Sequence, residues 1–306
     1  MGDLRVMATG LLFPEGPVAQ PDGSVVLVEI QRECISRVTP DGKVEVVVRL
    51  GGGPNGLAIG PDGAYYVCNN GGFLFQQVAG LNRTRAGTPE GYTGGWIERV
   101  DIKTGKSERL YDSCDGHRLK GPNDLVFDKH GGFYFTDLGK ARARDRDLGG
   151  CYYALADGSK IVELAFPFVT PNGVGLSPDG KVVYVAETET GRLWAFDLEE
   201  PGKAKKHPFP SPHGGRLVCG LPGYQRFDSM ALEANGNICI ATIITGCITV
   251  ISPDGHVVRQ VKVPDPVTTN ICFGGPDLKT AYITLSGTGQ LVSMDWPEPG
   301  LRLNHE

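Results

Sequence analysis

The sequence has 306 residues, with 35 acidic and 30 basic side chains and a net charge of −5. Charges of both signs are mixed along the chain, which excludes the basic stripe that a nucleic-acid-binding protein needs. No apolar run approaches the ~18 residues of a membrane span, and the first residues lack the apolar core of a secretory signal. We therefore expect a cytoplasmic globular protein that binds neither nucleic acid nor membrane.

The numbers and spacing of glycine and cysteine residues narrow the class of protein further. The 44 glycines and 22 prolines show no collagen period and predict many tight turns. The eight cysteines form no Cys-x-x-Cys pair, so we expect no thiolate metal site. Cys239 and Cys247 flank one predicted hairpin and could pair across it, but cytoplasmic chains rarely keep disulfides. We expect buried free thiols.

One short pattern recurs six times: a polar residue, an apolar stretch, an Asp-Gly-like turn and a β-rich run. The polar residues are Glu15, Asn55, Asn123, Asn172, Asp228 and Asn270, and the turns fall at residues 21–23, 61–63, 130–132, 178–180, 234–236 and 276–277. A second hairpin follows each copy, with turns such as Pro40-Asp41-Gly42 and Pro253-Asp254-Gly255. Two hairpins make a four-stranded antiparallel sheet, and such sheets repeated radially make a propeller.

We therefore predict an all-β fold, a six-bladed β-propeller formed as a single domain by residues 1–306. A strand from Leu4 to Leu11 should close the ring beside Leu291 to Asp295. This topology places the six polar residues together at one end of the central tunnel. Three long irregular stretches, residues 69–95, 138–150 and 210–226, should reach the same end and cover a pocket, because loops of this length inside a compact domain usually serve function.

A ring of six polar side chains in a narrow tunnel has two interpretations. The amides and acids could simply cap strand ends and bind water. Alternatively they hold a hard cation, because Ca²⁺ takes six to eight oxygen ligands from carboxylates, amides and water. Glu15 and Asp228 would repel each other without a cation. The set contains no His or Cys, which disfavours Zn²⁺ and copper, although Zn²⁺, Mn²⁺ or Mg²⁺ could still occupy an oxygen-rich site.

Several motifs resemble the gluconolactonase/regucalcin family of six-bladed propellers, over nearly the whole chain. They are Phe13-Pro14-Glu15-Gly16-Pro17, Gly121-Pro122-Asn123-Asp124-Leu125, Pro171-Asn172-Gly173, Phe227-Asp228-Ser229-Met230 and the segment from Asn270 to Asp277. The resemblance implies that Glu15, Asn172 and Asp228 bind one divalent cation. It places Asn123 by the metal or the substrate, and the related diisopropyl fluorophosphatase ligates calcium with all four residue types.

Other residues are candidates for contacts with a substrate. Asn123, Asn55 and Asn270 would bind it from the tunnel, the last two on the repeat pattern alone, and His117 could face the pocket from its loop. Sugar-lactone members of the family have an Arg two residues before the Asn that matches Asn123, but this chain has Gly121. Arg142, Arg144 and Arg146 lie in a predicted lid and are either a solvated face or contacts for an anionic substrate.

The resemblance implies a calcium-dependent lactonase that hydrolyses a small lactone, with a sugar lactone as one candidate, to a hydroxy acid. Asp228 would be the catalytic base, or would orient a metal-bound hydroxide. The same geometry would suit a phosphotriesterase-like hydrolase. A propeller that binds calcium or a small ligand without turnover, or one resembling strictosidine synthase, is the further alternative. The oligomeric state stays open.

Overall fold

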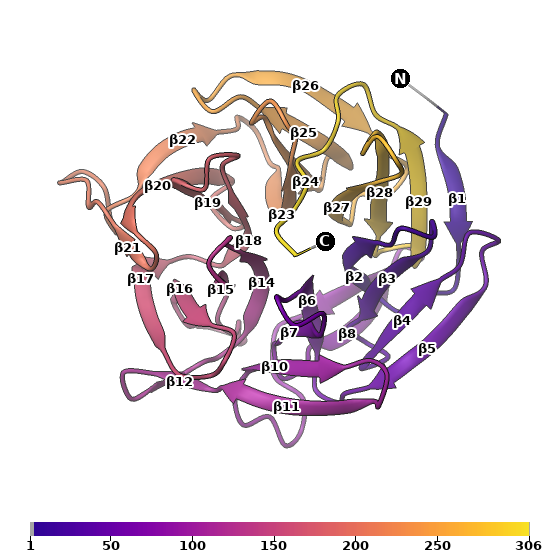
Figure 1. The fold of residues 1–306 in the computed structure, drawn as a ribbon, viewed down its shortest axis with the longest axis horizontal. Helices are drawn as coiled ribbons and strands as arrows, with labels where there is room; N and C mark the ends of the chain where they lie inside the picture. Colours follow the sequence, from indigo (N-terminus) through magenta and orange to yellow (C-terminus); the bar gives the residue numbers. More distant parts are fainter. Residues whose placement is uncertain (1–2, 306) are drawn as a thin grey trace.

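Six antiparallel sheets stand around a central tunnel in the computed structural model, which describes residues 3–305 (Figure 1). This confirms the predicted six-bladed propeller. The innermost strands β2 (Pro14–Ala19), β6 (Pro54–Ile59), β14 (Pro122–Phe127), β18 (Pro171–Leu176), β23 (Arg226–Leu232) and β27 (Thr268–Gly274) contact one another in this order around the tunnel. Every innermost strand therefore has a neighbour from the blade on each side.

The remaining strands follow outwards in each blade. In blades 1 to 3 they are β3 (Val25–Glu29), β4 (Cys34–Val38) and β5 (Val44–Arg49); β7 (Tyr65–Asn69), β10 (Trp96–Asp101) and β11 (Lys106–Tyr111); β15 (Gly132–Asp137), β16 (Gly149–Leu155) and β17 (Ile161–Phe168). In blades 4 to 6 they are β19 (Val182–Glu187), β20 (Arg192–Glu200), β21 (Lys203–Ala204) and β22 (Arg216–Gly220); β24 (Ile238–Ile243), β25 (Cys247–Ile251) and β26 (Val257–Lys262); β28 (Thr280–Leu285), β29 (Gln290–Asp295) and β1 (Arg5–Ala8). Two small hairpins, β8 (Leu74–Val78) with β9 (Leu81–Arg85) and β12 (Ser113–Cys114) with β13 (His117–Arg118), lie outside the blades.

The ring is closed by strands from the two ends of the chain. β1 pairs antiparallel with β29 and supplies the outermost strand of blade 6, as predicted. All eight cysteines are free in the structure, including Cys239 and Cys247. Among residues 3–305, no helix is long and apolar enough to cross a membrane.

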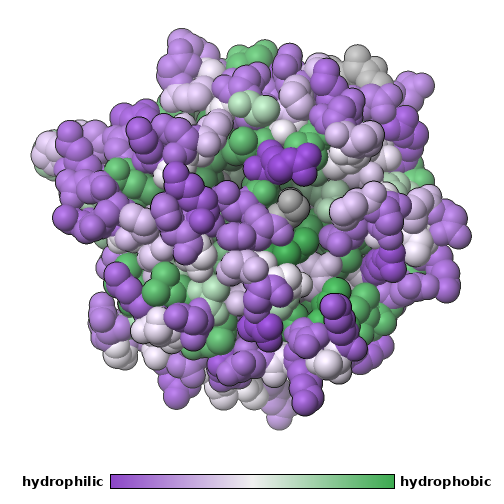
Figure 2. Space-filling model, viewed as in Figure 1, coloured by the Kyte–Doolittle hydropathy of each residue, from purple (hydrophilic) through white to green (hydrophobic). Residues whose placement is uncertain are grey.

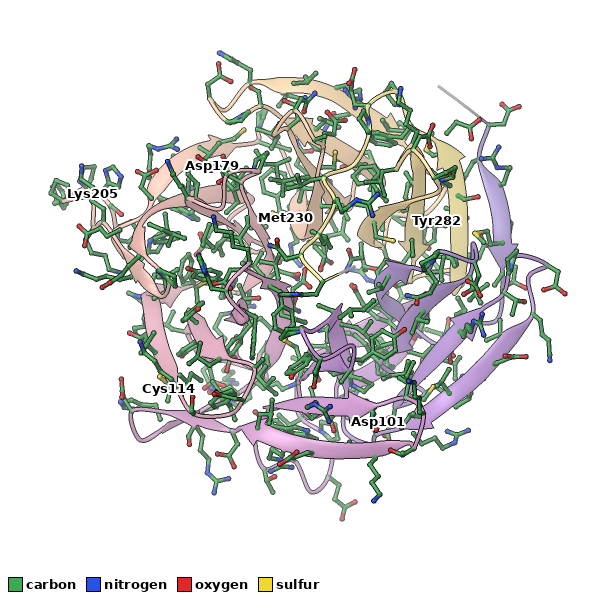
Figure 3. All side chains as sticks on the ribbon, viewed as in Figure 1. Asp101, Cys114, Asp179, Lys205, Met230 and Tyr282 are labelled. Carbon is green, nitrogen blue, oxygen red and sulfur yellow. The ribbon has the colours of Figure 1, made fainter. Side chains whose placement is uncertain are left out.

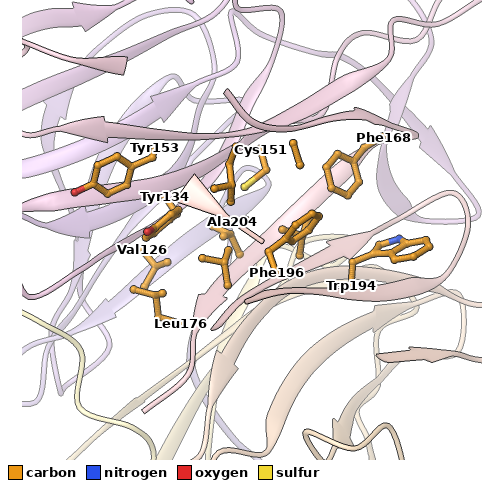
Figure 4. Close-up of a cluster of buried hydrophobic side chains, with 14 residues drawn as sticks. Val126, Tyr134, Cys151, Tyr153, Phe168, Leu176, Trp194, Phe196 and Ala204 are labelled. Carbon is orange, nitrogen blue, oxygen red and sulfur yellow. The ribbon is translucent and has the colours of Figure 1, made fainter. Parts of the chain in front are cut away.

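Apolar side chains pack between neighbouring blades. In the cluster of Figure 4, Val126 and Tyr134 of blade 3 lie near Leu176 of blade 4, and Tyr153 and Phe196 belong to the same cluster. Each fully buried side chain of this size contributes about 1.5–3 kcal/mol to folding, so the blade interfaces hold the ring together. Asp101 and Lys205 lie at the periphery in Figure 3, whereas Met230, on an innermost strand, lies near the centre.

One predicted loop is a strand. Residues 210–226 were expected to form an irregular lid, but β22 within them pairs with β20 as the outer strand of blade 4. The excursion before it buries His213, which stacks on Phe168 with ring centroids 4.0 Å apart. Residues 203–215 thus separate β20 from β22, the outer strand of blade 4. This insertion hid the four-strand pattern of the blade in the sequence.

The chain from Gly300 to His305 crosses the end of the tunnel opposite the predicted site. It bridges to Glu233 of blade 5 and then reaches blade 3, where Asn304 Nδ2 donates to the Phe127 carbonyl at 3.0 Å. His305 Nε2 lies 3.1 Å from the Asp128 carbonyl. Figure 2 shows this face as largely hydrophilic, with hydrophobic residues exposed around the middle of the ring. Behind the segment lies a mainly apolar cavity of about 680 Å³.

Three glycines set the spacing of the innermost strands. Gly16, Gly56 and Gly173 directly follow Glu15, Asn55 and Asn172. A Cβ at Gly56 would lie 2.5 Å from the Asn123 carbonyl oxygen, and one at Gly173 would lie 2.7 Å from that of Asp228. Real Cβ atoms do not approach backbone this closely. The glycines therefore allow adjacent strands to meet at the tunnel.

We predict that Gly173→Ala separates β18 from β23 and costs about 1–3 kcal/mol of stability, as overpacking of a close contact does. Thermal unfolding should show a lower midpoint. Gly220→Ala is the matched control, because the nearest atom to its new Cβ is 3.7 Å away. If both variants melt like the unmodified chain, the close contact does not set the strand spacing.

Candidate metal centre and pocket

Five of the predicted residues line one cavity of about 380 Å³ at the upper end of the tunnel, which is the end opposite Gly300–His305. They are Glu15, Asn55, Asn123, Asn172 and Asp228. Each lies at the second or third residue of an innermost strand and is at most 9% exposed. Because the innermost strands run in the same direction around the tunnel, equivalent positions meet at one level.

A local irregularity aims these side chains at the tunnel. In all six blades the pairing of the innermost strand with its neighbour shifts register at the site residue: between Glu15 and Val18, Pro54 and Gly56, Pro122 and Leu125, Pro171 and Val174, Phe227 and Met230, and Thr268 and Asn270. A β-bulge turns a side chain out of the regular alternation. Six bulges at equivalent positions let consecutive residues face the tunnel.

Glu15 is a buried carboxylate held by two donors. The Gly16 amide and Asn270 Nδ2 donate to Glu15 Oε2 at 3.0 and 2.9 Å. Burial raises the pKa of Glu15 from 4.5 to about 7, the donors oppose this rise, and the nearby Asp124 adds to it. The two hydrogen bonds fix the orientation of the carboxylate and offset part of the cost of burying it.

Asp228 is the second buried carboxylate. Burial raises its pKa well above the ordinary value, and the negative charges of Glu15 and Asp124 raise it further. A hydrogen bond from the Asn172 side chain opposes this rise of the Asp228 pKa. Asn172 Oδ1 in turn accepts a hydrogen bond from Ser229 Oγ at 3.3 Å. Two buried carboxylates at one site disfavour each other's charged form. A cation bound beside them would stabilise both in the charged form.

Asn123 carries the clearest sign of a missing ligand. Its Oδ1 atom is buried and has no hydrogen-bond partner among the described residues. An unpaired buried acceptor costs about 1–3 kcal/mol, and a cation would satisfy it. Residues 3–305 contain no group of three or more His, Cys, Asp and Glu placed to hold a metal, so a cation here would depend on amide oxygens beside the two carboxylates. Glu15, Asn123, Asn172 and Asp228 fit that requirement.

Asp124 is a third acid at the ring to which the sequence analysis gave no role. Its side chain lines the lower cavity, its Oδ1 accepts from the Leu125 amide at 2.9 Å, and burial raises its pKa to about 7. Strict alternation along β14 would have turned it away from the tunnel. The sequence signal was its position after Asn123, where the repeats at Glu15, Asn55 and Asn172 have glycine.

The structure places the other three predicted substrate contacts in different surroundings. Asn55 lines the upper cavity as expected. Asn270 instead lines the lower cavity and supports Glu15, because its Nδ2 is bound to that carboxylate. His117 is exposed on β13, where it pairs with Cys114, and is not part of the cavity wall. The structure therefore gives His117 no contact with this pocket.

Two of the three predicted lids cover the cavity. The β8–β9 hairpin reaches across to blade 6, where the Asn82 amide donates to the Gly287 carbonyl at 2.8 Å. The loop after β15 meets it through the Gly87 amide and the Ala141 carbonyl, also at 2.8 Å. Lys140, only 2% exposed, donates from Nζ to the Gly72 carbonyl at 2.8 Å and so ties the lids together.

Comparison with known proteins identifies the chain. The family described as SMP-30/Gluconolactonase/LRE-like region matches residues 13–287.

The chain belongs to this family.

Similar proteins include the gluconolactonase of Zymomonas mobilis, 27% identical over 92% of this chain and 79% of that protein. The lactonase drp35 of Staphylococcus epidermidis is 28% identical over 91% of this chain and 76% of its own. The crystal structure of the calcium-binding protein regucalcin from Agrobacterium tumefaciens superposes with a TM-score of 0.74 at 20% identity, covering 99% and 98% of the two chains. The fold and family expected from the motifs are confirmed, and the relatives are lactonases.

We predict that Glu15→Gln stabilises the cation-free protein above about pH 7. A buried acid with a raised pKa keeps its proton in the folded state, so its contribution to stability falls as pH rises from the unfolded pKa to the folded one. With a folded pKa of about 7, the destabilisation is complete above about pH 7 and absent below about pH 4.5. Melting in chelator should favour the variant at about pH 8, and the difference should shrink towards about pH 4.5.

Added calcium should reverse the order, because only the unmodified chain presents both carboxylates. A difference between the two proteins that does not change with pH would contradict the raised pKa of Glu15.

Proposed function

We propose that this protein is a metal-dependent lactonase that holds one divalent cation, calcium in the first place, and opens a small lactone to a hydroxy acid. The observation that carries the proposal is the buried set of two carboxylates and two amides beneath a covered pocket. The relatives named gluconolactonase and lactonase support the reaction class, and the neighbour named as calcium-binding regucalcin supports the cation.

The donor set favours calcium. Glu15, Asn123, Asn172 and Asp228 offer oxygen only, which suits hard cations such as Ca²⁺, Mg²⁺ and Mn²⁺. When bound, such a cation would offset the repulsion between the two carboxylates and polarise the carbonyl oxygen of a substrate. Zn²⁺ is also to be tested, because an oxygen-rich site does not exclude it.

Asp228 is the proposed general base. It lines the upper cavity, and ionised it accepts a proton from a water molecule as the water oxygen adds to the lactone carbonyl carbon. The tetrahedral intermediate then breaks the ring C–O bond, and the leaving alkoxide takes up a proton to give the hydroxy acid. Glu15 disfavours ionised Asp228, so the base is competent only when positive charge balances the pair.

The amides and the lids would orient the substrate. Asn55 and Asn123 line the cavity floor, where their side chains can bind the polar groups of a substrate. Phe73 and Lys140 line the cavity from the two lids, which restrict the access of water. Gly121 stands where sugar-lactone members of the family have an Arg. A polar clamp for the substrate must therefore come from another part of the wall.

We predict that Asp228→Asn lowers lactone hydrolysis by about 100-fold or more, the usual contribution of a positioned base. The measurement is turnover of a lactone panel with and without chelator, together with the metal content of the purified protein. Asp179→Asn is the control, because this aspartate lies at the Ser177–Gly180 turn and does not line the cavity.

Full activity of the Asp228 variant would overturn the assignment of the base. An organophosphate assayed beside the lactones separates the alternative phosphotriesterase-like activity. Bound calcium without turnover of either substrate would instead indicate a binding protein.

A further inference from the structure

Two arginines and one glutamate from three different blades meet on one wall of the upper cavity. Arg146 lies in the loop after β15, Glu189 follows β19, and Arg226 begins β23. Arg146 Nη2 is 3.3 Å from Glu189 Oε1, and Arg226 Nη2 is 2.8 Å from Glu189 Oε2. All three residues line the cavity that contains Glu15 and Asp228.

This wall has more positive charge than its own acid can balance. The single carboxylate of Glu189 pairs with the guanidinium groups of Arg146 and Arg226, so these three side chains carry a net charge of +1. Arg146 Nη1, Arg226 Nε and the hydroxyl of the adjacent Thr188 are buried, and none has a hydrogen-bond partner within residues 3–305. The Arg146 and Arg226 side chains remain 33% and 26% exposed. The unpartnered atoms are themselves buried, while other parts of the same two side chains reach the cavity.

Two further arginines add to the positive charge of the cavity. Arg83 and Arg85 line the cavity from the β8–β9 hairpin. In all, four arginines line the cavity, Arg83, Arg85, Arg146 and Arg226, together with Lys140, whose pKa burial lowers to about 7, against three acids, Glu15, Glu189 and Asp228. Two of those acids are the candidate cation ligands. A concave site with this balance attracts anions.

A purely structural role accounts for only part of this arrangement. The Glu189 carboxylate pairs with Arg146 of the lid loop and with Arg226 of blade 5. These two ion pairs are enough to join the lid loop to blades 4 and 5. They do not explain the three unpartnered donors, Arg146 Nη1, Arg226 Nε and Thr188 Oγ1, on the same wall. Guanidinium groups bind carboxylates and phosphates through paired N–H donors. An anionic group in the cavity would balance the excess positive charge of the two guanidinium groups.

We propose that the wall formed by Arg146, Thr188 and Arg226 binds an anionic group of the substrate, so that the preferred lactone carries a carboxylate or phosphate. This inference rests on the proposed lactonase function of the same cavity. The lactone carbonyl would face Asp228 and the cation ligands, while the anionic substituent points to the arginines. The two ends of the substrate are then distinguished by charge.

The test compares three lactones that differ in charge: glucono-δ-lactone, glucaro-γ-lactone and the phosphate ester of gluconolactone. We expect the unmodified protein to prefer one of the two anionic lactones. Arg146→Gln should lower kcat/KM for that lactone by about 10- to 100-fold, as expected for the loss of a charge-assisted hydrogen bond. The loss should appear mainly in KM, and turnover of the neutral lactone should change by less than about twofold. The preferred anion distinguishes carboxylate from phosphate.

The matched control is Arg144→Gln, which removes the same charge from the same lid but not from the cavity wall. It should behave like the unmodified protein with every lactone. No preference for either anionic lactone, or equal losses in both variants, would overturn the proposal and leave the lactonase function standing.

Two further measurements keep the test decisive. If Arg146→Gln does not fold, Glu189→Gln tests the wall in the opposite direction, because removing the competing carboxylate should lower KM for the anionic lactone. An unchanged or higher KM overturns the proposal. If no lactone is hydrolysed, the lactonase proposal fails, and calorimetric binding of glucarate and of a phosphorylated gluconate to the calcium-loaded protein decides the anion site. Binding that weakens about tenfold or more in Arg146→Gln supports the site, and equal binding overturns it.

Discussion

Two buried acids that line one cavity at the upper end of the tunnel are the constraint on which the rest of this protein depends. Glu15 and Asp228 lie on the first and fifth blades, and burial raises the pKa of each. The charge of Asp124 adds to the rise at Glu15, and the charges of Glu15 and Asp124 add to the rise at Asp228. Isolated buried charges cost several kcal/mol. The protein offsets part of that cost with donors from Gly16 and Asn270. Asn123 Oδ1 is buried and has no hydrogen-bond partner among the described residues, which is consistent with the proposed cation.

The propeller is suited to hold such a set. Every blade contributes its innermost strand, and glycines beside the site residues let these strands approach until their backbones touch. Apolar packing between blades, as in the cluster between blades 3 and 4, holds the strands in place around the tunnel. The site can therefore be prepared for a cation by the fold as a whole. The chemistry above it is then left to the lids, whose composition differs from the tunnel in being rich in arginine.

Much of this architecture could be predicted from the sequence, because the repeated turns and alternating strands are local signals. The same repeats placed Glu15, Asn55, Asn123, Asn172 and Asp228 around one cavity. The pattern failed where a local rule was broken. The bulges let Asp124 reach the tunnel beside Asn123, and the excursion before β22 disguised a strand as a loop. The Arg146–Glu189–Arg226 wall was not recognisable as a unit, because long-range packing alone brings its three residues together.

The segment from Gly300 to His305 affects which end of the tunnel gives access to the site. It lies across one mouth of the tunnel and is tied to blades 5 and 3. The ring of acids and amides separates that mouth from the cavity under the lids. The approach to Glu15 and Asp228 is therefore from the opposite mouth, where both carboxylates line the cavity beneath the β8–β9 hairpin.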